Sequence, residues 1–141
     1  MAVQSISVER NDIVMVDDIL YNTLSSLITI EKVGTNRVRV ELPFSLPSSK
    51  SISIDIYRDS SKLFISDHGL IYDELSSNGI TISEYDINRI QQYIYSIRGA
   101  FYENNELTVE SNELRLGKDI LLVVDIIKSI VFMLLFRYHI N

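Results

Sequence analysis

The sequence predicts an α+β fold, in which a small, mainly antiparallel sheet packs against helices. Apolar and polar residues alternate over 37–42 and again over 52–57, the period of a strand with one buried face. Elsewhere apolar residues recur every third or fourth position, the period of an amphipathic helix, over 13–27, 87–97 and 120–134. The length of 141 residues fits a single domain. We therefore expect residues 1–141 to form one domain of about four strands and about four helices.

The N-terminal part is predicted to be a helix that follows a loose segment. Residues 1–11 show no sustained period, so we expect them to form a loose lead-in. From Ile13 the apolar residues form a helical stripe that ends at Leu27. Gly34 comes next, in keeping with a helix end that needs a left-handed residue.

Three strands are expected in the middle of the chain, over 37–42, 52–58 and 63–66. Pro43 and Pro47, with nearby serines, predict a loop between the first two strands. The polar residues at 58–62 have the composition and length of a hairpin turn between the second and third strands.

A tight acidic turn is predicted to join this hairpin to a short helix. Asp67 and Gly69 suit a turn that presents a side-chain acceptor at a helix start. Residues 70–77 carry the apolar pattern of the helix, and Gly79 is a natural stop.

The next helix has the clearest start signal in the chain. Ser83 and Asp86 approximate a capping box, and Gly99 is expected to close the helix. Residues 101–102 and 107–110 flank an Asn-Asn turn and are expected to form a second small hairpin. The second of these segments is the fourth strand of the predicted sheet.

The last predicted helix, over 119–138, is long and apolar on nearly every side. Its core stripe is flanked by further apolar residues, and three more apolar residues fall in the sector expected to be polar. A helix of this kind is buried on more than one side, so we expect a partner or a second copy to cover that sector. The predicted interaction surface consists of Leu121, Asp125, Lys128, Phe132 and Phe136.

Composition removes several classes of function. The chain has no cysteine, which excludes disulfides, thiol nucleophiles and thiolate metal sites. The net charge of −6 and the scattered lysines and arginines argue against direct nucleic-acid binding. No secretory signal is recognisable, and charged residues interrupt the one long apolar run, so we expect a cytoplasmic protein that does not span a membrane.

The residues around the acidic turn offer the only candidates for catalysis. Asp67 and His68 lie in the turn, Asp55 lies on an adjacent strand, and Asp73 lies one turn into the helix. A histidine beside carboxylates can act as a general base or help to bind a metal. However, an Asp that precedes a Gly at such a turn usually bonds to the backbone, and this favours a structural role. No sequence motif indicates a cofactor or a metal site.

The order of these motifs resembles a bacterial and prophage family catalogued as domain of unknown function 1828. The shared motifs are Val-Glu-Leu-Pro-Phe at 40–44, Ile-Asp-Ile-Tyr at 54–57, Phe-Ile-Ser-Asp-His-Gly at 64–69, Leu75 and Gly79. The resemblance extends over roughly residues 13–135 and is specific in the central part. His68 stands where the family pattern usually has a second Asp, which weakens a metal-binding interpretation of the turn. The resemblance implies a compact α+β domain of bacteria and their mobile elements, without an established activity.

These observations predict a non-enzymatic, acidic protein-binding module of phage or prophage origin. The mobile-element setting that the resemblance implies suggests an inhibitor of a host defence system, of an anti-CRISPR or anti-restriction type. Its partner would be a protein, for example a host nucleoprotein or nuclease, and the chain would self-associate through the C-terminal helix. One alternative is a metal-dependent hydrolase or nuclease centred on Asp55, Asp67 and His68. Another is a structural dimerisation domain.

Overall fold

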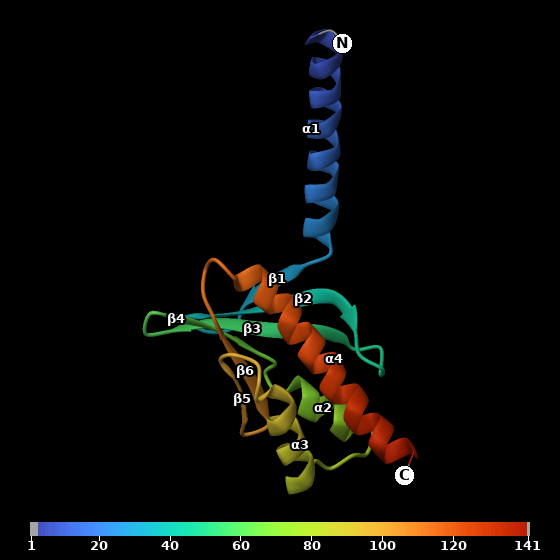
Figure 1. Cartoon of the computed structure of the whole chain (residues 1–141), viewed down its shortest axis with the longest axis vertical. Helices are drawn as coiled ribbons and strands as arrows, with labels where there is room; N and C mark the ends of the chain where they lie inside the picture. Colours follow the sequence, from blue (N-terminus) through green and yellow to red (C-terminus); the bar gives the residue numbers. More distant parts are fainter. Residues whose placement is uncertain (1–2, 141) are drawn as a thin grey trace.

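A six-stranded antiparallel sheet lies at the centre of the molecule, with strand order β1-β2-β3-β4-β6-β5 (Figure 1). The computed structural model describes the backbone of residues 3–140 and the side chains of residues 15–137. The strands are β1 (Thr29–Lys32), β2 (Arg37–Ser45), β3 (Ser51–Asp59), β4 (Lys62–Ser66), β5 (Ala100–Glu103) and β6 (Glu106–Ser111). The helices described are α1 (Val3–Ser26), α2 (Leu70–Ser77), α3 (Glu84–Ile94) and α4 (Leu116–Ile140). The α+β class is therefore confirmed.

One face of the sheet forms the hydrophobic core together with α2, α3 and α4. The predicted period-two alternation places Val40, Ile52 and Ile54 in this core, all of them buried. Ile65 and Leu107 extend the same face onto β4 and β6. The opposite face carries the polar half of the alternation, and it is the face on which the polar residues described below lie.

The sheet has six strands, not the four that were predicted. The helix α1 ends at Ser26, and the following Thr29 and Ile30 belong to the edge strand β1, in keeping with the strand preference of β-branched residues. β1 pairs antiparallel with β2, so Gly34 lies in the turn between them rather than at a helix end.

The other additional strand, β5, belongs to the predicted second hairpin. β5 and β6 pair across a turn in which Asn104 and Asn105 have φ values of 53° and 63°. Asparagine is one of the residues that tolerates this left-handed conformation, so the hairpin prediction is confirmed.

Strand β2 also continues through the predicted loop. It runs to Ser45 and includes Pro43, which lies beyond Glu41, the last residue of β2 paired with β1. A register shift relative to β3 occurs between Glu41 and Ser45. Proline is tolerated here because its missing N–H faces no neighbouring strand and the ladder is already interrupted.

The helices α2 and α3 agree closely with the sequence. Helix α2 covers Leu70–Ser77, as predicted. Helix α3 begins with a complete capping box, in which Ser83 accepts from the amide of Asp86 and Asp86 accepts from the amide of Ser83. It ends at Ile94, five residues before Gly99, which has a φ of 74° in the turn that leads into β5.

The first and last helices differ from the prediction. Helix α1 begins at Val3, where a loose segment was expected, and no Gly or Pro precedes Gly34 to break it. It stands clear of the rest of the molecule (Figure 1). Helix α4 has one buried side, but the other side is exposed and mixed in character, so the helix is not apolar all round. In the described part of the chain, no helix is long and apolar enough to cross a membrane.

Candidate functional site

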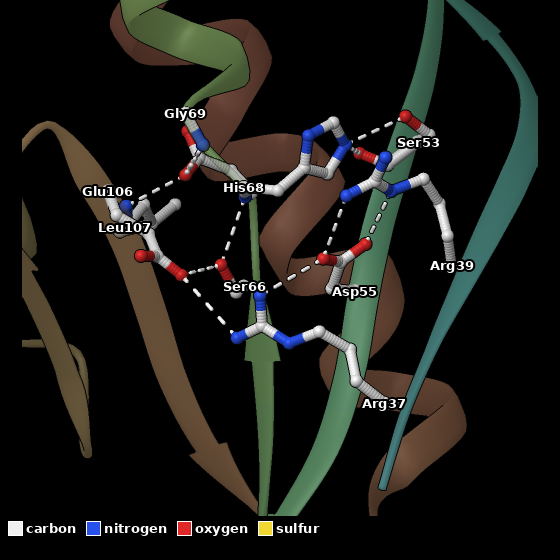
Figure 2. A network of polar contacts seen from close by, with 10 residues as sticks. Arg37, Arg39, Ser53, Asp55, Ser66, His68, Gly69, Glu106 and Leu107 are labelled. Atoms are coloured by element: carbon white, nitrogen blue, oxygen red, sulfur yellow. Dashed lines mark hydrogen bonds and ion pairs between the residues drawn. The ribbon is translucent and has the colours of Figure 1, made fainter. Parts of the chain in front are cut away.

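Asp55 lies at the centre of an arginine clamp on the polar face of the sheet (Figure 2). Its carboxylate is fully buried and accepts from Arg39 Nε at 2.7 Å, from Arg39 Nη2 at 3.1 Å and from Arg37 Nη1 at 3.2 Å. Arg39 is paired directly with Asp55 in the β2–β3 register, so strand geometry brings these side chains together. The hydrogen bond that Arg39 donates to Asp55 raises the pKa of Arg39, so the guanidinium stays charged.

The clamp continues along the same face into β4 and β6. Arg37 Nη2 lies 3.9 Å from Glu106 Oε2, and its guanidinium stacks on the Tyr57 ring at 4.4 Å. Glu106 accepts a hydrogen bond from the Ser66 hydroxyl, which itself accepts from the His68 amide at 2.9 Å. The network thus joins β2, β3, β4 and β6 (Figure 2). Sequence analysis missed Glu106, although its alternation with a buried leucine at 107 places it on the polar face.

Asp67 is buried as deeply as Asp55, but backbone amides hold it. Its carboxylate accepts from the amides of Leu107 at 2.8 Å, Gly69 at 3.0 Å and Ile71 at 3.1 Å. These bonds tie the turn to the first turn of α2 and to strand β6. Burial raises the pKa of Asp67 to about 6, and the three amide hydrogen bonds oppose that shift.

His68 occupies a position whose backbone conformation is demanding. Its φ is 44°, that of Gly69 is 83°, and the Leu70 amide donates to the Asp67 carbonyl at 2.9 Å. This is the geometry of a type I′ turn, in which Asn, Asp and His are the tolerated non-glycine residues. The turn therefore explains how a histidine can occupy this position.

The His68 side chain reaches across to β3. Its Nε2 lies 2.8 Å from Ser53 Oγ and 3.1 Å from the Ser53 carbonyl oxygen (Figure 2). Burial lowers the pKa of His68, and the positive charge of Arg39 lowers it further, so the imidazole is neutral near pH 7. Sequence analysis did not anticipate the contact with Ser53, which requires the register of β3 against the turn.

These contacts favour a structural role for the predicted catalytic residues. Asp55 and Asp67 share no partner, because one binds arginines and the other binds backbone amides. Asp73 lies exposed on α2 and belongs to neither of these two sets of contacts. Among the described residues, no group of three or more His, Asp or Glu side chains is placed to hold a metal ion.

The predicted interaction surface is a single exposed line along α4. At about 100° per residue, Leu121, Asp125, Lys128, Phe132 and Phe136 fall within one narrow sector of the helix, and all five are exposed. The three apolar members expose 56%, 66% and 55% of their surface, in sequence order. The last two stack their rings with centroids 6.0 Å apart. We refer to these five residues as the α4 strip.

A hollow of about 510 Å³ lies beside the α4 strip. Its lining comes from the β2–β3 connection and from α4, through Ser45, Leu46, Pro47, Lys128, Ser129 and Phe132. Lys128 Nζ also lies 5.0 Å from the centre of the Phe44 ring. The α4 strip is therefore bordered by a recess that could receive a side chain of a partner.

The buried Glu74 of α2 holds one wall of this hollow. Its carboxylate accepts from the Ser48 hydroxyl at 2.6 Å and from the Ser48 amide at 3.0 Å. Sequence analysis missed Glu74. The available signal was its spacing of four residues from Leu70, which places it on the buried side of α2.

The fold and its polar network define a small α+β domain built on an antiparallel sheet. A family model described as domain of unknown function DUF1828 matches residues 42–130, and the chain belongs to that family. The matched segment begins within β2 and ends within α4, so it contains the arginine-clamped Asp55, the Asp67 turn and most of the α4 strip. Comparison with curated proteins found no match, and neither did comparison with solved structures.

Proposed function

We propose that this protein is a non-enzymatic protein-binding module that contacts its partner through the α4 strip and the adjoining hollow. The observation that carries the proposal is the row of Leu121, Phe132 and Phe136, exposed in line beside a recess. Exposed apolar side chains that lie close together, as the stacked rings of Phe132 and Phe136 do, commonly mark interaction sites, and aromatic anchors dominate the binding energy at such sites.

The partner that fits this surface inserts an apolar side chain into the hollow and covers the two stacked rings. Asp125 and Lys128 lie between Leu121 and Phe132 on the same line and supply polar contacts within the surface. Burying the exposed apolar parts of three large side chains contributes several kcal/mol, at about 25 cal/mol per Å².

The narrower form of the proposal concerns the target. We propose an inhibitor of a host defence system, carried by a phage or prophage, whose target is a host nucleoprotein or nuclease. The net charge of −6 supports this form, because an acidic protein complements the basic nucleic-acid site of such a target. Affinity for the partner should then fall steeply as salt rises, and a flat salt response contradicts the narrower form.

The test is capture of a partner from the lysate of a bacterium that carries the gene. The wild-type chain and the double variant Phe132→Glu/Phe136→Glu are compared, with Tyr95→Glu as a matched control on an aromatic residue that is 90% exposed elsewhere. We expect the wild type and Tyr95→Glu to retain the same protein, and the double variant to lose it. Retention by all three, or capture of no protein by the wild type, contradicts the proposal.

The predicted enzyme alternative is a metal-dependent hydrolase or nuclease centred on Asp55, Asp67 and His68. A different hydrolase, with Ser53 as nucleophile, has one specific observation in its favour, the 2.8 Å contact between Ser53 Oγ and His68 Nε2. A hydroxyl within hydrogen-bond reach of an imidazole is the arrangement of a nucleophile and its base. The same Nε2 also lies 3.1 Å from the Ser53 carbonyl oxygen, and a nitrogen that donates there has no lone pair left for the hydroxyl proton.

The variants Ser53→Ala and His68→Asn separate this alternative from the proposal. Both should leave partner capture intact in a binding module, whereas a hydrolase would lose its function. For the metal-dependent form, a divalent cation should raise the melting temperature only if a site exists. The structural alternative, dimerisation through α4, predicts instead that Phe132→Glu/Phe136→Glu yields monomers and loses nothing else.

A further inference from the structure

Helix α1 is the largest part of the described chain that the molecule itself leaves uncovered. It projects from the β1 edge of the sheet and does not fold back on the body (Figure 1). Every residue from Met15 to Ile28 is exposed. A helix in this position receives no stabilisation from the core on which α2, α3 and α4 depend.

The exposed helix has a well-defined apolar face. At about 100° per residue, five of the six large apolar side chains from Met15 to Leu24 fall within one half of the helix circumference, and Tyr21, which is 73% exposed, falls in the other half. The apolar half consists of Met15, Val16, Ile19, Leu20 and Leu24, with Thr23 and Ser26 among them, and Leu27 follows directly after the helix end at Ser26. The opposite half carries Asp17, Asp18, Asn22 and Ser25. This distribution is that of an amphipathic helix, which packs through one side.

Local interactions do not explain why this helix forms. Its described side chains include β-branched residues, serine and asparagine, which are weak helix formers. No lysine or arginine lies between 15 and 28 to pair with Asp17 or Asp18. Most helical stability in proteins comes from packing of an apolar face against another surface. We therefore expect another surface to pack against the apolar face of α1.

We propose that α1 pairs with the α1 helix of a second copy of this chain. The available area fits this occupant. Six half-exposed apolar residues, at about 100 Å² each, contribute roughly 600 Å² per copy, or roughly 1,200 Å² for the pair. That total reaches the lower end of the range for stable interfaces.

The charges on α1 also favour a second copy. Over residues 15–27 the apolar face carries no charged residue, so two copies of this segment meet without charge repulsion. Asp17 and Asp18 lie on the opposite half of the helix and remain in water. A membrane surface is a poorer occupant, because interfacial helices rely on lysine and arginine to meet anionic lipids and this segment has only acidic charges.

This self-association is separate from the proposed binding of a partner by the α4 strip. It uses the helix at the other end of the chain, so a dimer joined through α1 presents two α4 strips. Two strips on one particle would strengthen binding to a target that repeats.

Sedimentation equilibrium at micromolar concentration tests the pairing. We expect the full chain to have twice the 16.2 kDa mass of one copy. Leu20→Glu/Leu24→Glu places charge on the apolar face and should give the monomer mass. Asn22→Glu/Ser25→Glu adds the same charge to the opposite half and should remain dimeric, as should Phe132→Glu/Phe136→Glu on α4.

A milder variant guards against loss of folding. Leu20→Ser/Leu24→Ser should weaken dimerisation at least about tenfold, because each leucine loses its burial, while circular dichroism reports an intact sheet. A monomeric wild type, a dimer that Leu20→Glu/Leu24→Glu leaves intact, or a dimer that only the α4 variant dissociates overturns the proposal. If the monomeric α1 variant still captures the partner, the α4 proposal stands whether or not the α1 pairing does. The two proposals can therefore fail independently.

Discussion

Asp55 and Asp67 are both fully buried carboxylates of the central hairpin region, yet their partners differ in kind. Asp55 binds the guanidinium groups of Arg37 and Arg39, whose side chains remain 33% and 40% exposed. Asp67 binds three backbone amides and no cation. One carboxylate therefore belongs to an ion pair at the edge of water, and the other is part of the backbone framework.

The comparison shows that the loss of stability on removing a buried carboxylate depends on how exposed its hydrogen-bond partners are, since both carboxylates are equally buried. Water can reach the two arginines if Asp55 is removed. It reaches the amides around Asp67 much less easily, because Ile71 and Leu107 are fully buried. The predictions that follow begin with this contrast and extend it to the neighbouring His68.

The largest effect is expected from Asp67→Ala, which leaves the amides of Gly69, Ile71 and Leu107 without their acceptor. Each buried unsatisfied donor costs about 1–3 kcal/mol, so we expect the free energy of unfolding to fall by about 3–5 kcal/mol. Denaturant unfolding followed by circular dichroism measures the loss. A loss below about 1 kcal/mol would mean that the amides find other acceptors, and the framework role of Asp67 would be wrong.

A second prediction concerns pH. The pKa of Asp67 is raised to about 6, so the folded protein holds this proton more tightly than the unfolded chain does. Its contribution to stability is then fully present below about pH 4 and is lost as pH rises through about 6, a change of roughly 2–3 kcal/mol.

The wild type and Asp67→Asn, unfolded at pH 4.5 and at pH 7, provide the measurement. We expect the wild type to gain stability relative to the variant at the lower pH, since His68 is common to both proteins and its effect cancels. The opposite sign would show that the three amides outweigh burial and hold the pKa below its ordinary value.

A smaller effect is expected from Asp55→Ala. Removal of one partner from a buried ion pair can cost several kcal/mol, but the two arginines are partly exposed and water screens them. We expect a loss of about 1–2 kcal/mol, measured as for Asp67→Ala. A loss larger than that of Asp67→Ala would reverse the comparison.

The smallest effect is expected from His68→Asn, because the backbone conformation decides which residues position 68 tolerates. His68→Asn should change stability by less than about 1 kcal/mol, because Asn also tolerates a φ of 44°. His68→Val should cost about 1–2 kcal/mol more, because a β-branched residue is strained in that conformation. Thermal unfolding of the two variants compares them, and equal stability would show that the turn imposes no such strain.

The His68→Asn variant also tests how His68 affects the stability of the protein at low pH. The pKa of His68 is lowered, so its contribution to stability is lost as pH falls through the ordinary histidine value of about 6.5. The wild type should therefore lose stability relative to His68→Asn at low pH. Adjacent residues of one turn would then respond to acid with opposite signs.

Much of the fold follows from local patterns in the sequence. The capping box at Ser83, the short helix from Leu70 and the hairpin of β3 and β4 all rest on residues within a few positions of one another. Local patterns failed where a neighbour in space decides the outcome. Strand β1 forms because β2 is there to pair with it, and Pro43 fits a strand because β1 has already ended.

The candidate site was predictable in part for the same reason. The exposed line from Leu121 to Phe136 follows from helical spacing alone. The partners of Asp55 and the contact of His68 with Ser53 depend on strand register, which residue spacing does not specify. The spacing of Glu74 from Leu70 places it on the buried side of α2 but does not identify its partner, because Ser48 lies 26 positions away.

The bond between Glu74 and Ser48 has a consequence for any partner that enters the hollow. A connection between strands is usually mobile and loses entropy when a ligand orders it. Here the buried Glu74 carboxylate accepts hydrogen bonds from both the amide and the hydroxyl of Ser48, so one wall of the hollow is preorganised. A partner that binds in the hollow would therefore find this wall already ordered, and little of the binding free energy would be lost to ordering the connection.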